Sequence, residues 1–139
     1  MTGMRKIFVD SDYLIDYLRG KHYTKELLDK IQGKHFEAYI SVITVFELYT
    51  GAFLSNNSKK RFEDVETLLA WFNVIDVNKQ IMLLASKINV YLRKKGTIIG
   101  IQDIIIAASA ISVNIPFLTN NKKHFKNIQE LEIKSWDEY

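Results

Sequence analysis

Three acidic residues interrupt the most apolar stretches of this chain. Asp10 ends the apolar run 7–9, Glu47 lies inside the segment 42–49, and Asp103 precedes the run 104–108. Carboxylates are rarely buried unless a charged partner or a metal compensates them. We therefore expect the three side chains to emerge at the ends of packed elements. If they converge there, they would form an oxygen-rich site suited to Mg²⁺ or Mn²⁺.

The composition predicts a single globular domain covering residues 1–139. Hydrophobic residues make up 47% of the chain and charged residues 25%, which is enough apolar material for a core and argues against disorder. Pro116 is the only proline, and no linker-like segment divides the chain. The absence of cysteine excludes disulfides and thiolate metal sites.

The chain shows no targeting or membrane-spanning pattern. Only three apolar residues separate Lys6 from Asp10, which is too few for the core of a signal peptide. The longest apolar run, 104–111, contains Ser109 and is far shorter than the roughly 20 residues that a membrane helix needs. We expect a cytoplasmic protein that does not bind a membrane.

Short apolar segments alternate with segments of helical periodicity. Strands are predicted at 5–10, 37–41, 74–77, 116–119 and 131–134, and helices at 12–19, 24–31, 44–54, after 56–58, from 78 to the basic residues 93–95, and at 102–113. This alternation predicts an α/β fold with a short, mostly parallel central sheet and helices on both faces. Functional sites of such sheets lie beyond the carboxyl ends of the strands, where we expect Asp10 and residues 119–121.

Each acidic residue also has a purely structural interpretation. Asp10 or Asp12 would serve as the N-cap of the helix that follows. Thr44 and Glu47 fit a capping box, and Asp103 in a first helical turn is favoured by the helix dipole. Three caps at one edge of a sheet would nevertheless bring their carboxylates together, which is costly unless a cation neutralises the charge.

Four stretches of the sequence, taken in order, point to a known family. Residues 7–18, 41–51, 101–110 and 117–125 resemble the PIN-domain ribonucleases, and among them the VapC-type toxins of toxin–antitoxin pairs. The resemblance extends from about residue 6 to residue 134. It implies a three-layer PIN-like fold, an Mg²⁺- or Mn²⁺-dependent endoribonuclease acting on RNA, a homodimer and an antitoxin partner.

The resemblance also assigns roles to individual positions. It implies metal ligands at three carboxylates and further catalytic contributions from two hydroxyls and an amide: Asp10, Glu47 and Asp103, then Ser11, Thr119 and Asn121. Asn121 stands where the family has a fourth acidic residue. Asn is neutral and a poorer ligand, so the number of metal ions stays open. Asp12 stands where the family more often has Asn, and would add negative charge or only cap a helix.

Two other function classes are compatible with parts of the pattern. Residues 10–12 are similar to the D-x-D start of haloacid-dehalogenase phosphatases, although Leu14 replaces their Thr and the late Asp pair is missing. A catalytically weak or inactive PIN-fold module that binds RNA or protein is the second alternative, favoured by Asn121. Binding of Mn²⁺ that depends on Asp10 and Asp103 would distinguish an enzyme from such a module.

Charge and aromatic residues suggest where partners would bind. The net charge is +3, with basic clusters at 59–61, 93–95 and 122–123 that would steer RNA phosphates or simply be solvated. The three histidines show no zinc spacing, so we expect surface or loop roles for them. The candidates for an apolar dimer surface are Phe53, Phe62, Trp71, Tyr91 and Leu92.

Overall fold

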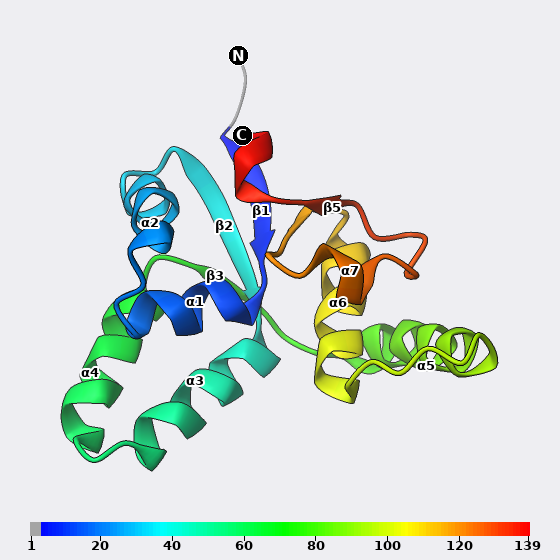
Figure 1. The fold of residues 1–139 in the computed structure, drawn as a ribbon, viewed down its shortest axis with the longest axis horizontal. Coiled ribbons are helices and arrows are strands. Elements are labelled where there is room, and N and C mark those ends of the chain that lie inside the picture. Colours follow the sequence, from blue (N-terminus) through cyan, green and yellow to red (C-terminus); the bar gives the residue numbers. More distant parts are fainter. Residues whose placement is uncertain (1–3) are drawn as a thin grey trace.

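A five-stranded parallel sheet forms the centre of the molecule in the computed structural model, which describes residues 4–139 (Figure 1). Residues 1–3 lie outside the described residues. They belong to the expected domain and to the N-terminal segment for which no signal peptide was predicted. The strands are β1 (Arg5–Val9), β2 (Phe36–Ser41), β3 (Asn73–Ile75), β4 (Phe117–Leu118) and β5 (Ile133–Lys134). The predicted parallel α/β fold is confirmed.

The strand order places one switch point in the middle of the sheet. The order is β3-β2-β1-β4-β5, so the chain first moves from β1 outward through β2 to β3 and then returns to the other side of β1. Phe8 and Val9 of β1 pair with Phe117 and Leu118 of β4. Loops leaving adjacent strands diverge at such a point, which leaves a crevice at their carboxyl ends. Asp10 and Thr119 directly follow these two strands.

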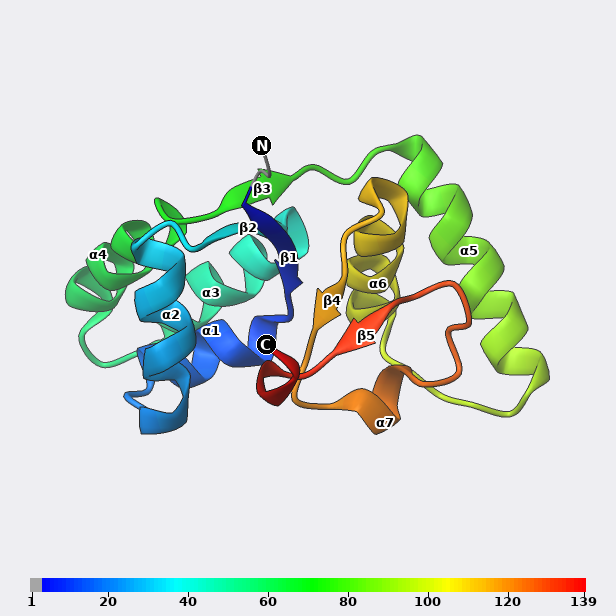
Figure 2. The same cartoon turned by 90° about the horizontal axis from the view of Figure 1, so that it is seen from above.

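Helices cover both faces of the sheet, as Figure 2 shows from above. One layer contains α1 (Ser11–Leu18), α2 (Lys25–Gln32), α3 (Val42–Leu54) and α4 (Ser58–Leu69), whose apolar residues share one cluster. The other layer contains α5 (Lys79–Lys94), α6 (Ile101–Val113) and the short α7 (Lys122–Phe125). Two single 3₁₀ turns, His22–Thr24 and Trp136–Glu138, complete the elements of the described chain.

Side-chain caps determine where three of the helices begin. Asp10 caps α1, Ser41 caps α3 and Asn78 caps α5, each by accepting a hydrogen bond from a backbone N–H of the first turn. The capping-box interpretation of Thr44 and Glu47 is therefore wrong. Helix α3 begins two residues before Thr44, because Ser41 at the end of β2 already satisfies the first free N–H groups.

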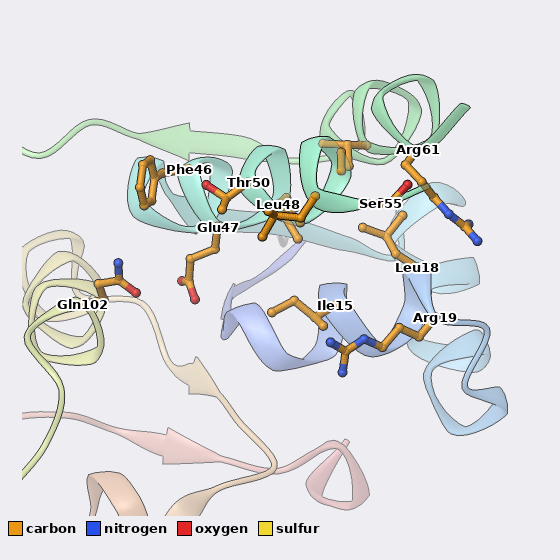
Figure 3. A pocket seen from close by; sticks show the side chains of 14 residues that line it. Ile15, Leu18, Arg19, Phe46, Glu47, Leu48, Thr50, Ser55, Arg61 and Gln102 are labelled. Carbon is orange, nitrogen blue, oxygen red and sulfur yellow. The ribbon is translucent and has the colours of Figure 1, made fainter. Parts of the chain in front are cut away.

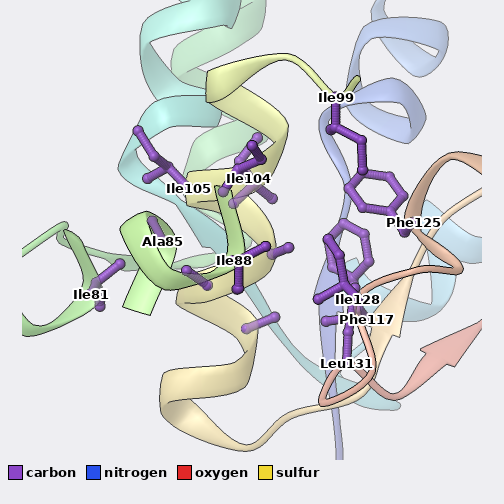
Figure 4. Close-up of a cluster of buried hydrophobic side chains, with 14 of the residues drawn as sticks. Ile81, Ala85, Ile88, Ile99, Ile104, Ile105, Phe117, Phe125, Ile128 and Leu131 are labelled. Carbon is purple, nitrogen blue, oxygen red and sulfur yellow. The ribbon is translucent and has the colours of Figure 1, made fainter. Parts of the chain in front are cut away.

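Helix α6 is the central buried helix that its sequence predicts. From Ile104 to Ala110 every side chain is buried, and the alanines at 107, 108 and 110 are fully enclosed. Figure 4 shows this helix packed between α5 and the side chains of Phe117 and Phe125. The rings of these two phenylalanines meet edge to face, with their centroids 4.9 Å apart. This packing fixes α7, and hence the turn after β4, against α6.

Several apolar side chains remain at the surface. Phe46 and Phe53 of α3 are 60% and 64% exposed, and Ile98 before α6 is 93% exposed. Leu92, by contrast, is buried against α6, so it is wrong as a candidate for a dimer surface. Across residues 4–139, the structure contains no helix long and apolar enough to traverse a lipid bilayer.

Candidate active site

Asp10 leaves β1 into the crevice at the switch point and is nearly enclosed there. Its Oδ1 accepts a hydrogen bond from the Ser11 backbone N–H at 2.8 Å, and its Oδ2 accepts one from the Thr119 hydroxyl at 2.7 Å. The side chain is only 5% exposed. Burial raises the pKa of the Asp10 carboxyl from 3.8 to about 7, the negative charges of Asp12 and Asp103 add to this, and the two hydrogen bonds oppose it.

Ser11 joins the next acidic residue to this network. Its hydroxyl donates to Glu47 Oε1 at 2.8 Å and lies 2.7 Å from the Thr44 hydroxyl. Glu47 lies in the second turn of α3 and so reaches the site from the helix side rather than from its terminus. Burial raises the pKa of Glu47; the hydrogen bond from Ser11 opposes this shift, and the charge of Asp103 adds to it.

Asp103 approaches from the other layer, in the first turn of α6. Its Oδ2 lies 2.9 Å from His124 Nε2, a side chain carried by α7. Sequence reasoning missed this contact and assigned His124 a surface or loop role. No local pattern could have revealed it, since the contact depends on how α7 packs against α6.

A fourth carboxylate, Asp12, lies close to the same group. Burial raises the pKa of Asp12 to about 6; a hydrogen bond from the Tyr13 backbone lowers it, and the charge of Asp16 raises it. The Oδ1 atom of Asp12 is buried and has no hydrogen-bond partner within the described chain. Asp12 does not cap α1, because Asp10 holds that position.

Asn121 lies at the exposed rim, beyond β4. Its backbone N–H donates to the Thr119 hydroxyl at 3.0 Å, so the turn that carries Asn121 also fixes the hydroxyl that holds Asp10. The predicted site residues at the end of β4 are thus linked to Asp10 through one hydroxyl group.

The electrostatic environment of these carboxylates is unusual. Asp10 and Glu47 each accept a hydrogen bond from a hydroxyl group, and Asp103 lies within hydrogen-bond distance of His124. None of the three forms an ion pair with a lysine or arginine of residues 4–139. Unpaired charges in a half-buried site are stabilised by a cation. As arranged in the described chain, no three His, Asp or Glu side chains form a group that could hold a metal ion.

A largely apolar groove begins at this site (Figure 3). It has a volume of about 530 Å³ and lies between α1, α3 and α4. Glu47 and Gln102 line one end, whereas Arg19 and Arg61 line the other, with Ile15, Leu18 and Leu48 between them. The groove therefore combines an apolar floor with opposite charges at its two ends.

The predicted basic clusters are partly neutralised. Lys60 and Arg61 pair with Asp64 at 2.7 Å and 3.5 Å, and Lys122 pairs with Glu138 at 2.6 Å. Such exposed pairs add little stability. They do reduce the positive charge that these clusters offer to a polyanion.

A comparison with protein families decides what this arrangement represents. The family model for the PIN domain matches residues 7–131, which includes the four carboxylates of the site, Asp10, Asp12, Glu47 and Asp103. The chain belongs to the PIN-domain family. This membership excludes the haloacid-dehalogenase alternative, and it agrees with the parallel sheet and the site at its switch point.

Relatives of this PIN domain include a protein named Ribonuclease VapC1 from Methanocaldococcus jannaschii. The two are 33% identical over 132 residues, which cover 95% of this chain and 88% of the relative. Among solved structures, VapBC-1 from nontypeable Haemophilus influenzae is similar with a TM-score of 0.81 and 30% identity, covering 95% of this chain and 98% of that one. A DNA-bound VapBC from Salmonella typhimurium gives a TM-score of 0.84 and 28% identity, covering 96% and 99%.

Proposed function

We propose that this PIN domain is an Mg²⁺- or Mn²⁺-dependent endoribonuclease and the toxin of a type II toxin–antitoxin pair, acting in the cytoplasm. The observation that carries the proposal is the group of carboxylates at the switch point, where the charge of Asp103 acts on both Asp10 and Glu47 and none of the three pairs with a lysine or arginine of residues 4–139. Relatives that cover most of the chain are named ribonucleases, which supports RNA as the substrate.

The donor set fits a hard divalent cation. Carboxylate oxygens are the ligands that Mg²⁺ and Mn²⁺ prefer. Asp10, Glu47 and Asp103 would hold the ion, directly or through water, after their side chains turn toward it. When bound, such a cation lowers the pKa of a water molecule and neutralises charge that develops on the phosphate.

The remaining site residues have distinct proposed tasks. Thr119 and the Ser11 backbone keep the Asp10 carboxylate oriented, and the Ser11 hydroxyl does the same for Glu47. Asn121, at the exposed rim, is placed to contact the RNA or an ordered water through its amide. A neutral amide is a weak ligand, so Asn121 does not favour a fully occupied second cation site, and the number of cations stays open.

Metal-dependent cleavage tests the proposal against a non-catalytic PIN-fold module. Purified protein should cleave single-stranded or looped RNA with Mg²⁺ or Mn²⁺, and EDTA should stop the reaction. Asp10→Asn should lower the rate well over tenfold, whereas Asp76→Asn, which alters an exposed carboxylate with no ion pair in residues 4–139, should not. Equal cleavage by folded Asp10→Asn and wild-type protein would exclude the metal-ligand role.

The apolar groove is the proposed binding site for an antitoxin segment. Structural neighbours are VapBC complexes, and an amphipathic segment that orders on binding suits a groove of this kind. Gly51 lines the groove, and a Cβ atom added there meets no atom within 4 Å. Gly51→Trp should therefore prevent binding of the co-expressed antitoxin without disturbing the fold, while Gly51→Ala should leave antitoxin binding intact. Equal antitoxin binding by both variants would remove the groove from the proposal.

A homodimer is the proposed assembly of this domain. Helix α3 carries the exposed apolar side chains Phe46, Phe53 and Leu54, and α5 carries Met82, Leu83 and Val90. Exposed apolar side chains that lie together mark interaction sites, and a two-fold contact would bury them on both copies. Light scattering at micromolar concentration should give about twice the chain mass. A monomer under these conditions would count against this assembly but not against the nuclease site.

A further inference from the structure

His124 contacts the acidic site without belonging to the set that the sequence indicates. Its Nε2 atom lies 2.9 Å from Asp103 Oδ2, within hydrogen-bond distance. The imidazole is about 29% exposed and the Asp103 side chain about 37%. Among the described residues, no other side chain hydrogen-bonds to the Asp103 carboxylate. Among the described residues, His124 is therefore the side chain that can orient the Asp103 carboxylate through a hydrogen bond.

Contacts of both the backbone and the ring hold His124 in place beside Asp103. The His124 backbone N–H donates to the Asn121 carbonyl at 3.0 Å, and the His124 ring packs edge to face on Phe125, with centroids 5.1 Å apart. Phe125 is in turn buried against Phe117 of β4. The ring thus has a rigid support that reaches back to the central sheet.

The same short segment serves two carboxylates. Residues 119–124 carry both Thr119, which donates to Asp10, and His124, which contacts Asp103. Ser11 performs the equivalent task for Glu47. Asp10, Glu47 and Asp103 thus each contact one polar side chain that can donate to them, and His124 is the one that contacts Asp103. Hydrogen bonds of this kind to carboxylate ligands fix their orientation and typically change metal affinity.

We infer that His124 is a positioning residue that donates a hydrogen bond to Asp103 and holds its carboxylate in the orientation in which it binds the divalent cation. The inference rests on the proposed metal-dependent function. The donor, rather than the bulk or the aromatic character of the ring, is the property that matters. An exposed histidine–aspartate pair without this task would leave cation binding unchanged when it is removed.

Two substitutions separate the donor from the ring. His124→Phe keeps a ring to pack on Phe125 but removes the donor, whereas His124→Gln supplies an amide donor near the position of Nε2 but removes the ring. The dissociation constant for Mn²⁺ alone is measured at fixed pH from the EPR signal of free Mn²⁺. His124→Phe should weaken Mn²⁺ binding about 10- to 100-fold, and His124→Gln should restore most of it. His124→Ala, at this partly exposed position, provides a second donor-free variant should the Phe variant not fold.

A double-mutant cycle shows whether the effect acts through Asp103. In an Asp103→Asn background, His124→Phe should cause little further loss of Mn²⁺ affinity. The inference would be overturned if the folded His124→Phe or His124→Ala variant bound Mn²⁺ with wild-type affinity. It would also be overturned if His124→Phe, which keeps a ring, bound Mn²⁺ more tightly than His124→Gln, which keeps a donor. Coupling to an imidazole ¹⁴N nucleus in the EPR spectrum of bound Mn²⁺ would also overturn the inference, because it would show that His124 is itself a metal ligand. Failure of the wild-type protein to bind Mn²⁺ would instead refute the proposed function together with this inference.

Discussion

Replacing Asp10 with asparagine should stabilise the protein at alkaline pH when divalent cations are absent. Burial and neighbouring charges raise the pKa of Asp10 in the folded protein to about 7, against 3.8 for an ordinary aspartate. The folded state therefore binds this proton more tightly than the unfolded chain does. Ionisation of Asp10 destabilises the fold, and this destabilisation grows as the pH rises from about 4 to about 7.

The size of the effect follows from the shift. At 1.36 kcal/mol per pKa unit, the ionised Asp10 destabilises the fold by about 4 kcal/mol above pH 7. Asparagine keeps one acceptor oxygen for the Ser11 N–H, and the Thr119 hydroxyl can turn to accept from the new amide. Weaker hydrogen bonds would reduce the gain by about 1 kcal/mol, which leaves roughly 3 kcal/mol. For a chain of this size that corresponds to a rise in Tm of roughly 10 °C.

Urea unfolding in EDTA, followed by circular dichroism at pH values from 4 to 8, measures this difference. The free energy of unfolding of Asp10→Asn should exceed that of the wild type by a margin that is small at pH 4 and largest at pH 8. Asp76→Asn is the matched control and should show no such trend. Saturating Mn²⁺ should narrow the margin at pH 8, because the cation stabilises only the wild type. If the difference in unfolding free energy between Asp10→Asn and the wild type did not depend on pH, Asp10 would not be a buried carboxylate with a raised pKa, and the reasoning would be refuted.

Three further predictions address the site and its support. Glu47→Gln keeps an acceptor for the Ser11 hydroxyl and removes a half-buried carboxylate whose pKa burial raises, so it should not lower the urea midpoint at neutral pH, yet it should weaken Mn²⁺ binding about tenfold or more in a titration. Phe125→Ala empties a fully buried position beside Phe117 and should lower the free energy of unfolding by about 3–5 kcal/mol in urea. In Gly51→Ala, the added Cβ atom would contact no neighbouring atom, so this substitution within α3 should raise the free energy of unfolding by about 0.5–1 kcal/mol in urea. A lower free energy of unfolding would show that the glycine is needed there.

The alternation of short apolar runs with helical periodicity was sufficient to predict the fold class. Periodicity reports which face of an element is apolar, so it identified α6 as a buried helix and placed β1 and β4 in the sheet. It was less accurate at boundaries. The start of α3 was predicted at Thr44, because the capping-box pattern competes there with Ser41, and only the end of β2 decides which cap is used.

The sequence by itself therefore determined the strands, the six longer helices, the site-bearing strand ends and the family to which the chain belongs, but it did not predict the short helix α7. The contacts within the site were decided by the tertiary structure alone. Thr119 reaches Asp10 across 109 residues, Ser11 reaches Glu47 across 36, and His124 reaches Asp103 across 21. Such hydrogen bonds depend on strand order and on the packing of α7 against the core. Local periodicity carries no information about either, because it describes one element at a time, whereas a shared site requires several elements to meet.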